Sequence, residues 1–386
     1  MSMERDIALN SPAYIALRNA YINRVHTLQA LKLKGKKIIW VFGATAPEEI
    51  IAAAGMIPVR AWGCAAPWPQ SDKYLEASFG PVWRALFDAV LSGENRAIMD
   101  GLVFSSSAAM ISKLGMYIGK ISGREPEKDL PPVYSLPYDS FHEEEVMFPR
   151  NVNETKRFAK KMEEWSGQPI TEKNLAAAVK TYNAYRAALR EVIKYRTAPD
   201  CRLTGCEALT VIGATLLMDK EIATLLLKDL ARDLKNWPVV DAAPVFYSGS
   251  QQENHMVYGL IEELGGNVVG EDHDWGNRVA DLDIKTDGDL YEAITYRYVH
   301  MMPNAEKSKV ATRVALVPGL IEGCGAKGWV IYMNYNDESF IWDYPSIKKA
   351  LADDFPIFVA AKQRVPFKDE EKLREDLGGF IGGIRR

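Results

Sequence analysis

Short apolar runs alternate with segments of helical periodicity through the first part of the chain. The apolar runs predict strands at residues 38–42, 56–61, 101–104 and 132–136. Helices are predicted at 47–55 and 74–91, and the serines at 105–107 are expected to cap a further helix. Strands that alternate with helices form parallel sheets covered on both faces, so this pattern predicts a doubly wound α/β domain.

The remaining segments follow two other patterns. Residues 1–35, 171–196 and 209–234 carry apolar side chains at helical spacing without intervening strand runs. A second alternation places strands at 239–247, 267–269, 328–333 and 356–360, with a helix at 256–264. The expected fold is therefore α/β, with two doubly wound parallel-sheet domains of Rossmann or flavodoxin type joined by a helical segment. The expected limits are 1–35 for an N-terminal helical segment, 36–170 for the first α/β domain, 171–236 for the helical connector and 237–386 for the second α/β domain.

Composition narrows the class of protein. The chain has 386 residues, 47% of them hydrophobic and 25% charged, with a net charge of −4. These values are typical of a globular protein with more than one domain and predict no broad basic surface for nucleic acid. The N-terminus lacks an apolar signal core, and no apolar run is long enough to span a bilayer. We therefore expect a cytoplasmic protein without nucleic-acid or membrane partners.

The cysteine spacing does not predict a metal site. The four cysteines are Cys64, Cys201, Cys206 and Cys324, and no two of them form a C-x-x-C pair. Disulfides are rare in cytosolic proteins, so these residues are expected to be free thiols.

Two loops after predicted strands are candidate ligand sites, because ligands of open parallel sheets bind beyond the carboxyl ends of strands. In the first loop, the Thr45 hydroxyl is a candidate to bind a carbonyl or phosphate, with an ordinary helix cap as the alternative. In the second, Ser248 begins a small polar segment that leaves room for a ligand. The sequence contains neither a dinucleotide-binding fingerprint nor a phosphate-binding P-loop, so the chain is not expected to hydrolyse ATP.

A third loop, residues 271–278, combines three acids, an imidazole, an indole and a guanidinium. The flanking carboxylates are expected to raise the pKa of His273, which is the candidate catalytic proton donor. Trp275 and Arg278 are candidates to contact a flat ring and a phosphate of the substrate. The alternatives are a structural loop in which Arg278 pairs with an acid, or a metal site that would require further ligands; no metal site is predicted.

Four segments, in this order and spacing, carry a resemblance to a known family. They read PEEIIAAAG at 47–55, YLEASFGPVWR at 74–84, GGNVVGED at 265–272 and FIWDYP at 340–345. Across essentially its whole length the chain resembles the 2-hydroxyacyl-CoA dehydratase and benzoyl-CoA reductase family. Its length and the loop at 272–278 are most similar to the C (gamma) subunits of class I, ATP-dependent benzoyl-CoA reductases.

This resemblance implies an oxidoreductase subunit that is inactive alone. The implied reaction is the ferredoxin- and ATP-dependent reduction of benzoyl-CoA to a cyclohexadienoyl-CoA in anaerobic aromatic degradation. The implied partners are a homologous cluster-bearing subunit, ATP-hydrolysing activator subunits, ferredoxin and the acyl-CoA substrate. Two alternatives are the beta subunit of a 2-hydroxyacyl-CoA dehydratase and a catalytically silent scaffold subunit.

The resemblance also implies three positions for cluster ligands. The family binds [4Fe–4S] clusters through cysteines at strand ends, and the matching positions here are Gly80, Ser106 or Ser107, and a residue near Asn336. These residue types are poor iron ligands. We therefore expect the partner subunit to hold the cluster, while Ser107 and Asn336 contact substrate. The alternative is a shifted correspondence in which Cys64 or Cys324 contributes.

Overall fold

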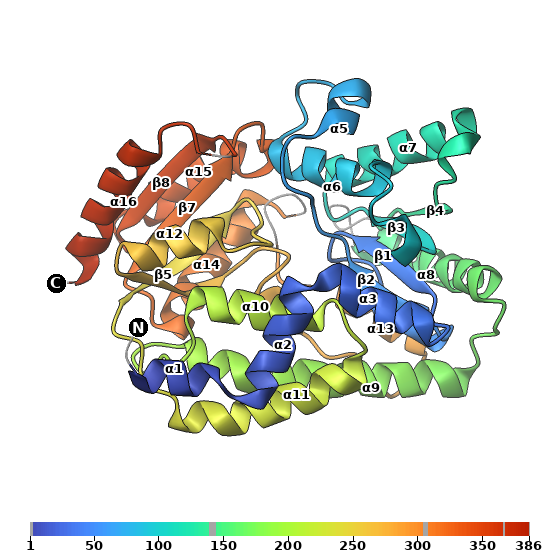
Figure 1. The fold of residues 1–386 in the computed structure, drawn as a ribbon, viewed down its shortest axis with the longest axis horizontal. Coiled ribbons are helices and arrows are strands. Elements are labelled where there is room, and N and C mark those ends of the chain that lie inside the picture. The colour runs from blue at the N-terminus through green and yellow to red at the C-terminus, as the bar shows by residue number, and fades with distance from the viewer. Residues whose placement is uncertain (1–2, 139–143, 304–307, 366, 386) are drawn as a thin grey trace.

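The chain folds around two parallel β-sheets (Figure 1). The computed structural model describes residues 3–138, 144–303, 308–365 and 367–385. Sheet A has the strand order β2-β1-β3-β4, and sheet B has the order β6-β5-β7-β8. The strands are β1 Ile38–Phe42, β2 Ile57–Arg60, β3 Gly101–Ser105, β4 Val133–Leu136, β5 Ala243–Gly249, β6 Gly266–Glu271, β7 Gly328–Asn334 and β8 Ile357–Gln363. The predicted fold class is confirmed.

The same strand order occurs in both sheets and fixes where a ligand can approach each of them. β1 pairs in parallel with β2 on one side and β3 on the other, and β5 pairs likewise with β6 and β7. The direction of winding thus reverses between β1 and β3 in sheet A and between β5 and β7 in sheet B. Ligands of doubly wound sheets bind at such switch points, outside the carboxyl ends of the strands.

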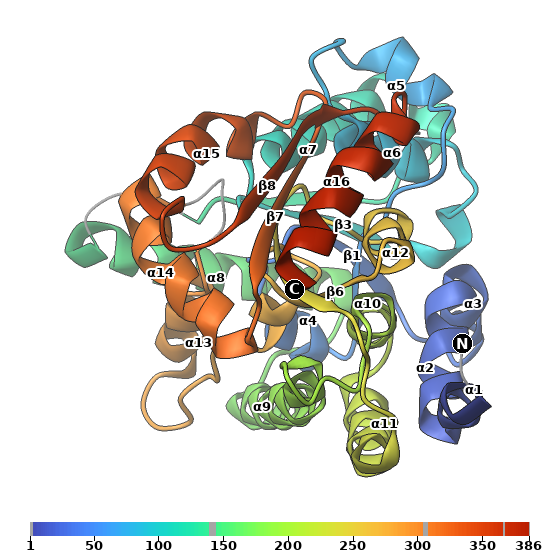
Figure 2. The same cartoon turned by 90° about the vertical axis from the view of Figure 1, so that its left-hand side faces the viewer.

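Helices cover both faces of each sheet. They are α1 Met3–Leu9, α2 Pro12–Ile22, α3 Arg24–Leu33, α4 Glu48–Ala53, α5 Pro69–Tyr74, α6 Pro81–Leu91, α7 Ala109–Arg124, α8 Glu144–Ser166, α9 Glu172–Ile193, α10 Gly205–Thr215, α11 Lys220–Asp233, α12 Met256–Glu263, α13 Leu290–Val299, α14 Val310–Cys324, α15 Glu338–Leu351 and α16 Glu370–Arg385. Figure 2 shows α12 and α16 on one side of sheet B, and α14 and α15 on the other. Because both faces are covered, β1 and β7 are buried along their whole length.

One helix returns from the second half of the chain to the first sheet. Ile294 and Tyr298 of α13 lie in the apolar cluster that contains Ile39, Val41 and residues of α4, α8 and α9. The apolar cluster on one face of sheet A, to which α4, α8 and α9 contribute, is therefore completed by a segment that follows β6 in the sequence.

Several predicted elements have different limits in the structure, and four of them differ most clearly. The helix expected at 74–91 is two helices, because Pro81 disfavours a helical conformation at Gly80, whose ψ is 168°. The helix expected at 209–234 restarts at Asp219, whose carboxylate accepts hydrogen bonds from two amides of α11. The strand expected at 239–247 begins only at Ala243. The serines do not cap α7: its N-cap is Ala108, while the hydroxyls of Ser105 and Ser106 donate to the carbonyls of Phe42 and Tyr138.

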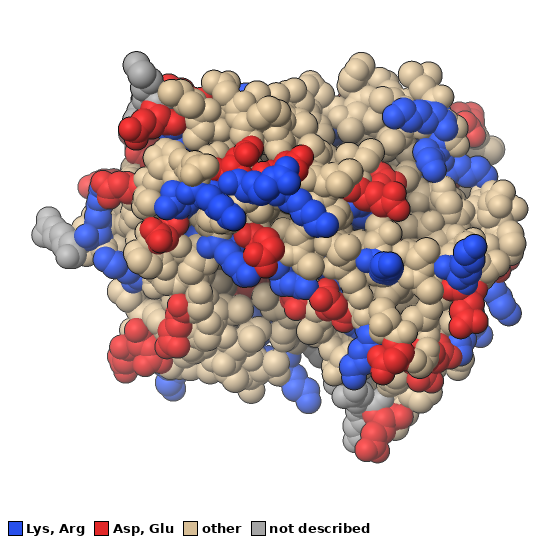
Figure 3. Space-filling view, turned by 90° about the horizontal axis from the view of Figure 1, so that it is seen from below, with Lys and Arg blue, Asp and Glu red and all other residues tan. Residues whose placement is uncertain are grey.

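Surface charge is mixed on the face seen from below. Lysine and arginine side chains form a band there, with acidic side chains along both of its sides (Figure 3). Among the helices of the described ranges, none has both the length and the apolar character that a bilayer span requires.

Candidate functional site

The loops at the carboxyl ends of the two sheets contact each other, and we call this region the interdomain edge. The side-chain amide of Asn336, after β7, donates to the carbonyl of Ala77 at 3.0 Å. The amide of Gly63, after β2, donates to Oε1 of Glu253 at 2.6 Å. Because both switch points open toward this region, it is the candidate functional site.

The loop after β1 presents an enclosed hydroxyl. Gly43 has a φ of +84°, and a Cβ added there would lie 2.0 Å from the Ser107 Oγ and 2.5 Å from the Ser105 Oγ. This close approach brings the β1 and β3 loops together at the switch point of sheet A. The Thr45 Oγ1 is enclosed and has no hydrogen-bond partner among the described residues. An unpaired buried hydroxyl is costly, so Thr45 remains the candidate residue of this loop for a polar contact.

On the sheet B side, the Ser248 and Asn336 side chains differ in burial and in hydrogen bonding. The Ser248 hydroxyl is buried, donates to Oδ2 of Asp272 at 3.0 Å and accepts from the Trp329 indole at 3.0 Å. Asn336 is half-buried, and its φ of 58° is uncommon for a residue other than glycine. Ser248 is therefore engaged within the protein, whereas Asn336 lies at the interdomain edge itself.

The acidic-histidine loop is an interior element. His273 is 4% exposed; its Nε2 lies 2.9 Å from the Tyr258 hydroxyl, and its Nδ1 accepts from the amide of Trp275 at 3.2 Å. Burial lowers the pKa of His273 to about 4 and outweighs the opposing effect of Glu271 and Asp274. The prediction that the flanking carboxylates raise the pKa of His273 is wrong, because burial removes water from the charged imidazole and this effect is the larger one.

The other two candidates in this loop are also enclosed. Trp275 is 1% exposed, and the Arg24 guanidinium lies 5.6 Å from its ring centroid. Arg278 forms an ion pair with Asp274 and donates from Nε to the carbonyl of Met302 at 2.9 Å. This arrangement favours the structural interpretation of the loop over substrate contact.

A buried ionic network beside α4 was missed in the sequence. The Glu49 carboxylate lies 2.6 Å from the Arg186 guanidinium and accepts from the Tyr298 hydroxyl at 2.7 Å. Glu48 lies 3.4 Å from Arg60 and 3.5 Å from Lys220. The signal that was overlooked is two adjacent acids inside an otherwise apolar helix.

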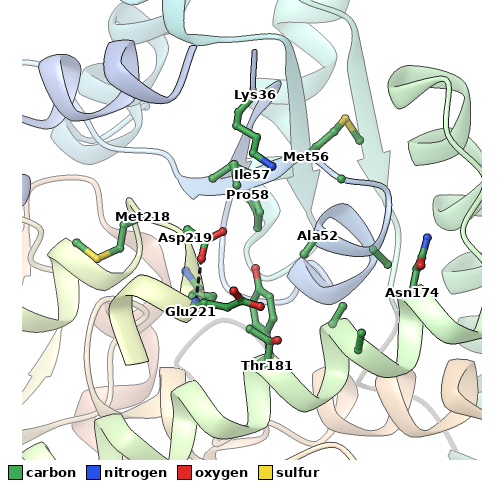
Figure 4. A pocket seen from close by; sticks show the side chains of 16 residues that line it. Lys36, Ala52, Met56, Ile57, Pro58, Asn174, Thr181, Met218, Asp219 and Glu221 are labelled. Carbon is green, nitrogen blue, oxygen red and sulfur yellow. Dashed lines mark hydrogen bonds between the residues drawn. The ribbon is translucent and has the colours of Figure 1, made fainter. Parts of the chain in front are cut away.

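A pocket of about 360 Å³ next to this network opens at the other end of sheet A (Figure 4). Ile57 and Pro58 at the start of β2 line it, together with Lys36, Asp219 and Glu221. Ligand sites of doubly wound folds lie at the carboxyl ends of strands, so this pocket is separate from the interdomain edge.

The residues present do not fit an iron–sulfur cluster. A side chain at position 80 would have its Cβ 3.0 Å from the carbonyl oxygens of both Tyr335 and Asn336. The four thiols are free, and burial raises the pKa of Cys64, Cys201 and Cys324 to about 11 each. Thiolates, not thiols, bind iron. Within the described residues, no three His, Cys, Asp or Glu side chains gather as a metal-binding group.

Comparison of the sequence with known proteins identifies the family of this chain. The chain is 25% identical over 343 residues to the beta subunit of (R)-2-hydroxyglutaryl-CoA dehydratase from Acidaminococcus fermentans, covering 84% of this chain and 86% of that protein. It is 21% identical over 374 residues to the (R)-phenyllactyl-CoA dehydratase beta subunit of Clostridium sporogenes, covering 92% and 94%. It is 24% identical over 272 residues to a subunit of the benzoyl-CoA reductase from Thauera aromatica, covering 69% and 68%. A sequence profile for the D-component of 2-hydroxyglutaryl-CoA dehydratase matches residues 44–382, and the chain belongs to that family.

Proposed function

We propose that this chain is a non-ATPase subunit of the catalytic module of an acyl-CoA reductase or dehydratase and that it does not itself hold a [4Fe–4S] cluster. Family membership supports the acyl-CoA chemistry. The observation that carries the second part is the interdomain edge, where Gly80, Ser107 and Asn336 offer no thiolate. A homologous partner subunit would hold the cluster, and separate activator subunits would hydrolyse ATP.

Within this proposal the chain supplies binding and enclosure at the interdomain edge. In this role the unpaired Thr45 hydroxyl would bind the ligand, Asn336 links the loops of the two sheets, and Ser107 supports the loop after β1. The sheet B side of the site is stiffened from within by four buried side chains, those of Ser248, His273, Trp275 and Arg278. A dry site suits reduction of a thioester substrate because water is excluded from reactive intermediates.

Two substrate classes follow from the relatives. The first is an aromatic acyl-CoA, as in ferredoxin- and ATP-dependent reduction of benzoyl-CoA, which is favoured by the resemblance of the loop at 272–278 to the C subunits of that enzyme. The second is a 2-hydroxyacyl-CoA, which the dehydratase beta subunits favour because they match a larger share of the chain. Turnover of benzoyl-CoA and of a 2-hydroxyacyl-CoA by the assembled complex distinguishes them.

Iron analysis tests the proposed division of labour. After anaerobic reconstitution with iron and sulfide, the chain alone is expected to retain no stoichiometric iron, whereas its complex with the partner retains about four irons per cluster. A matched sample of the partner alone shows where the iron resides. About four irons on the isolated chain, lost in Cys64→Ala or Cys324→Ala, would contradict the proposal.

A further inference from the structure

A second concave region lies beside the interdomain edge, on the open side of sheet B. It is a pocket of about 500 Å³ between the edge strand β8 and the first turns of α16. These two elements run side by side in both ribbon views (Figures 1 and 2). The basic side chains that line it are Lys362, Arg364, Lys368 and Lys372.

The charge of this pocket is unbalanced. Four cationic side chains line it against two carboxylates, Asp369 and Asp376, an excess of two positive charges in a chain whose net charge is −4. Within the described chain, none of the four cations forms an ion pair, although the nearby Arg374 pairs with Glu263 and Glu370. Unpaired cations around a concave surface attract a multiply charged anion.

The backbone is distorted at the same place. Among the described residues other than glycine, three have positive φ, and two of these are Asn336 at 58° and Lys362 at 56°. The pairing of β7 with β8 also shifts register between Tyr332 and Asn334. Left-handed backbone at non-glycine residues is costly and concentrates at ligand sites. The distortion turns the ends of β7 and β8 away from regular pairing at the rim of the pocket.

A flat surface adjoins the cations. The ring of Tyr335 is part of the pocket lining, the residue is 40% exposed, and the Arg364 guanidinium lies 4.8 Å from the ring centroid. Phe358 adds an apolar surface to the lining. An aromatic and guanidinium pair of this kind provides a stacking platform for a purine. Tyr335 directly precedes Asn336, which places the platform next to the interdomain edge.

We infer that this pocket binds the 3′-phosphorylated ADP portion of coenzyme A. That group combines a purine with three phosphate groups, and the pocket combines a stacking surface with four cationic side chains. The thioester arm then extends past Asn336 toward the interdomain edge. The inference rests on the proposed function, because it names the part of the acyl-CoA substrate that this chain recognises.

Direct binding tests the inference without turnover. Coenzyme A, dephospho-CoA and adenosine 3′,5′-bisphosphate are titrated by calorimetry into the full chain and into its complex with the partner. CoA is expected to bind at least about tenfold more tightly than dephospho-CoA, which lacks the 3′-phosphate, and to bind more weakly as salt rises. The triple variant Lys362→Gln, Arg364→Gln, Lys368→Gln is expected to lose at least about tenfold in CoA affinity.

The matched control removes three exposed lysines from α9 and α11, Lys173→Gln, Lys180→Gln and Lys228→Gln, and is expected to leave CoA affinity unchanged. Equal CoA affinity in both triple variants overturns the inference. So does a pocket variant that loses partner association but keeps CoA affinity, because the pocket is then a protein interface. If the complex that carries the pocket variant binds CoA normally and turns over acyl-CoA, the inference is refuted and the proposed function stands. If the wild-type complex neither binds CoA nor turns over acyl-CoA, the proposed function is refuted.

Discussion

The pKa values of single buried residues in this protein depend on the balance between burial and neighbouring charges. His273 is adjacent in sequence to Asp272 and Asp274, yet burial holds its pKa far below the usual value of 6.5. Glu49 shows the opposite balance: burial alone would raise its pKa, but the Arg186 and Arg297 guanidiniums outweigh burial and lower it. The imidazole is therefore neutral at pH 7 and the carboxylate is charged, and each protonation state is held by its contacts.

The pKa of His273 predicts how stability depends on pH. The folded pKa of about 4 lies below the unfolded value of 6.5, so the unfolded chain binds the proton first as pH falls. The contribution of His273 to the free energy of unfolding is complete above about pH 6.5. It is lost as the pH falls from 6.5 to 4, by at most roughly 3 kcal/mol. Urea unfolding across this range is expected to show a pH-dependent difference between the wild type and His273→Gln.

The exposed histidine on α3 provides the control for that experiment, since His26→Gln is expected to unfold like the wild type at each pH. The folded fraction of His273→Gln is expected to keep normal kinetics in the assembled complex. A turnover defect in His273→Gln, with unfolding unchanged at every pH, would instead make this imidazole a proton donor.

Among the secondary-structure elements, α9 connects the helical segment to sheet A through a buried charge. The side chains of Arg186 on α9 and Glu49 on α4 are 2% and 0% exposed. Arg190, one turn further along α9, pairs with Asp283 at the surface, where the side chains are 36% and 45% exposed. Two arginines on one helix therefore make the same kind of ion pair in very different surroundings.

This contrast predicts different costs for the same substitution. Arg186→Met leaves Glu49 charged and without its closest cation in the interior, so we expect the free energy of unfolding to fall by about 3–5 kcal/mol. Arg190→Met is expected to cost about 1 kcal/mol or less, because its pair is exposed to solvent. Urea unfolding of both variants checks this; equal losses would mean that α9 is not held by the buried pair.

The sequence predicted the elements better than their ends. Apolar runs identified all eight strands of the described residues, because buried parallel strands contain few polar residues. The helix predicted across Gly80 failed because the helical periodicity continues through a turn fixed by Pro81. In the candidate site, Thr45 was proposed from its place after a predicted strand and Asn336 from the family resemblance, and their contact with a ligand stays a prediction. The role of Glu48 and Glu49 and the pKa of His273 depended on partners distant in sequence, which a periodic pattern does not reveal.

At the scale of the whole molecule, large apolar side chains remain exposed on the N-terminal helices. Ile7, Ile22 and Leu33 on α1, α2 and α3 are 68%, 59% and 90% exposed. Apolar side chains exposed on one subunit are candidates for a surface that a partner covers. A subunit of a permanent complex is expected to bury such surface against a partner.

The isolated chain is therefore expected to self-associate. Sedimentation velocity over a range of concentrations should show association that is reduced in the triple variant Ile7→Ser, Ile22→Ser, Leu33→Ser. The control carries Met116→Ser, Val146→Ser and Val239→Ser, whose wild-type residues are 55%, 65% and 48% exposed on other elements. A monomer at all concentrations, with a melting transition that the partner subunit does not alter, would contradict the expectation.

The return of α13 to sheet A has a consequence for how the protein is made. Ile39 and Val41 leave the ribosome early, but Ile294 and Tyr298, which complete the apolar cluster on that face, follow some 250 residues later. During translation the apolar cluster on this face of the first sheet therefore stays incomplete until α13 has been synthesised. Nascent chains truncated before residue 290 are expected to engage chaperones and to resist stable folding, whereas chains released after residue 299 can close the sheet.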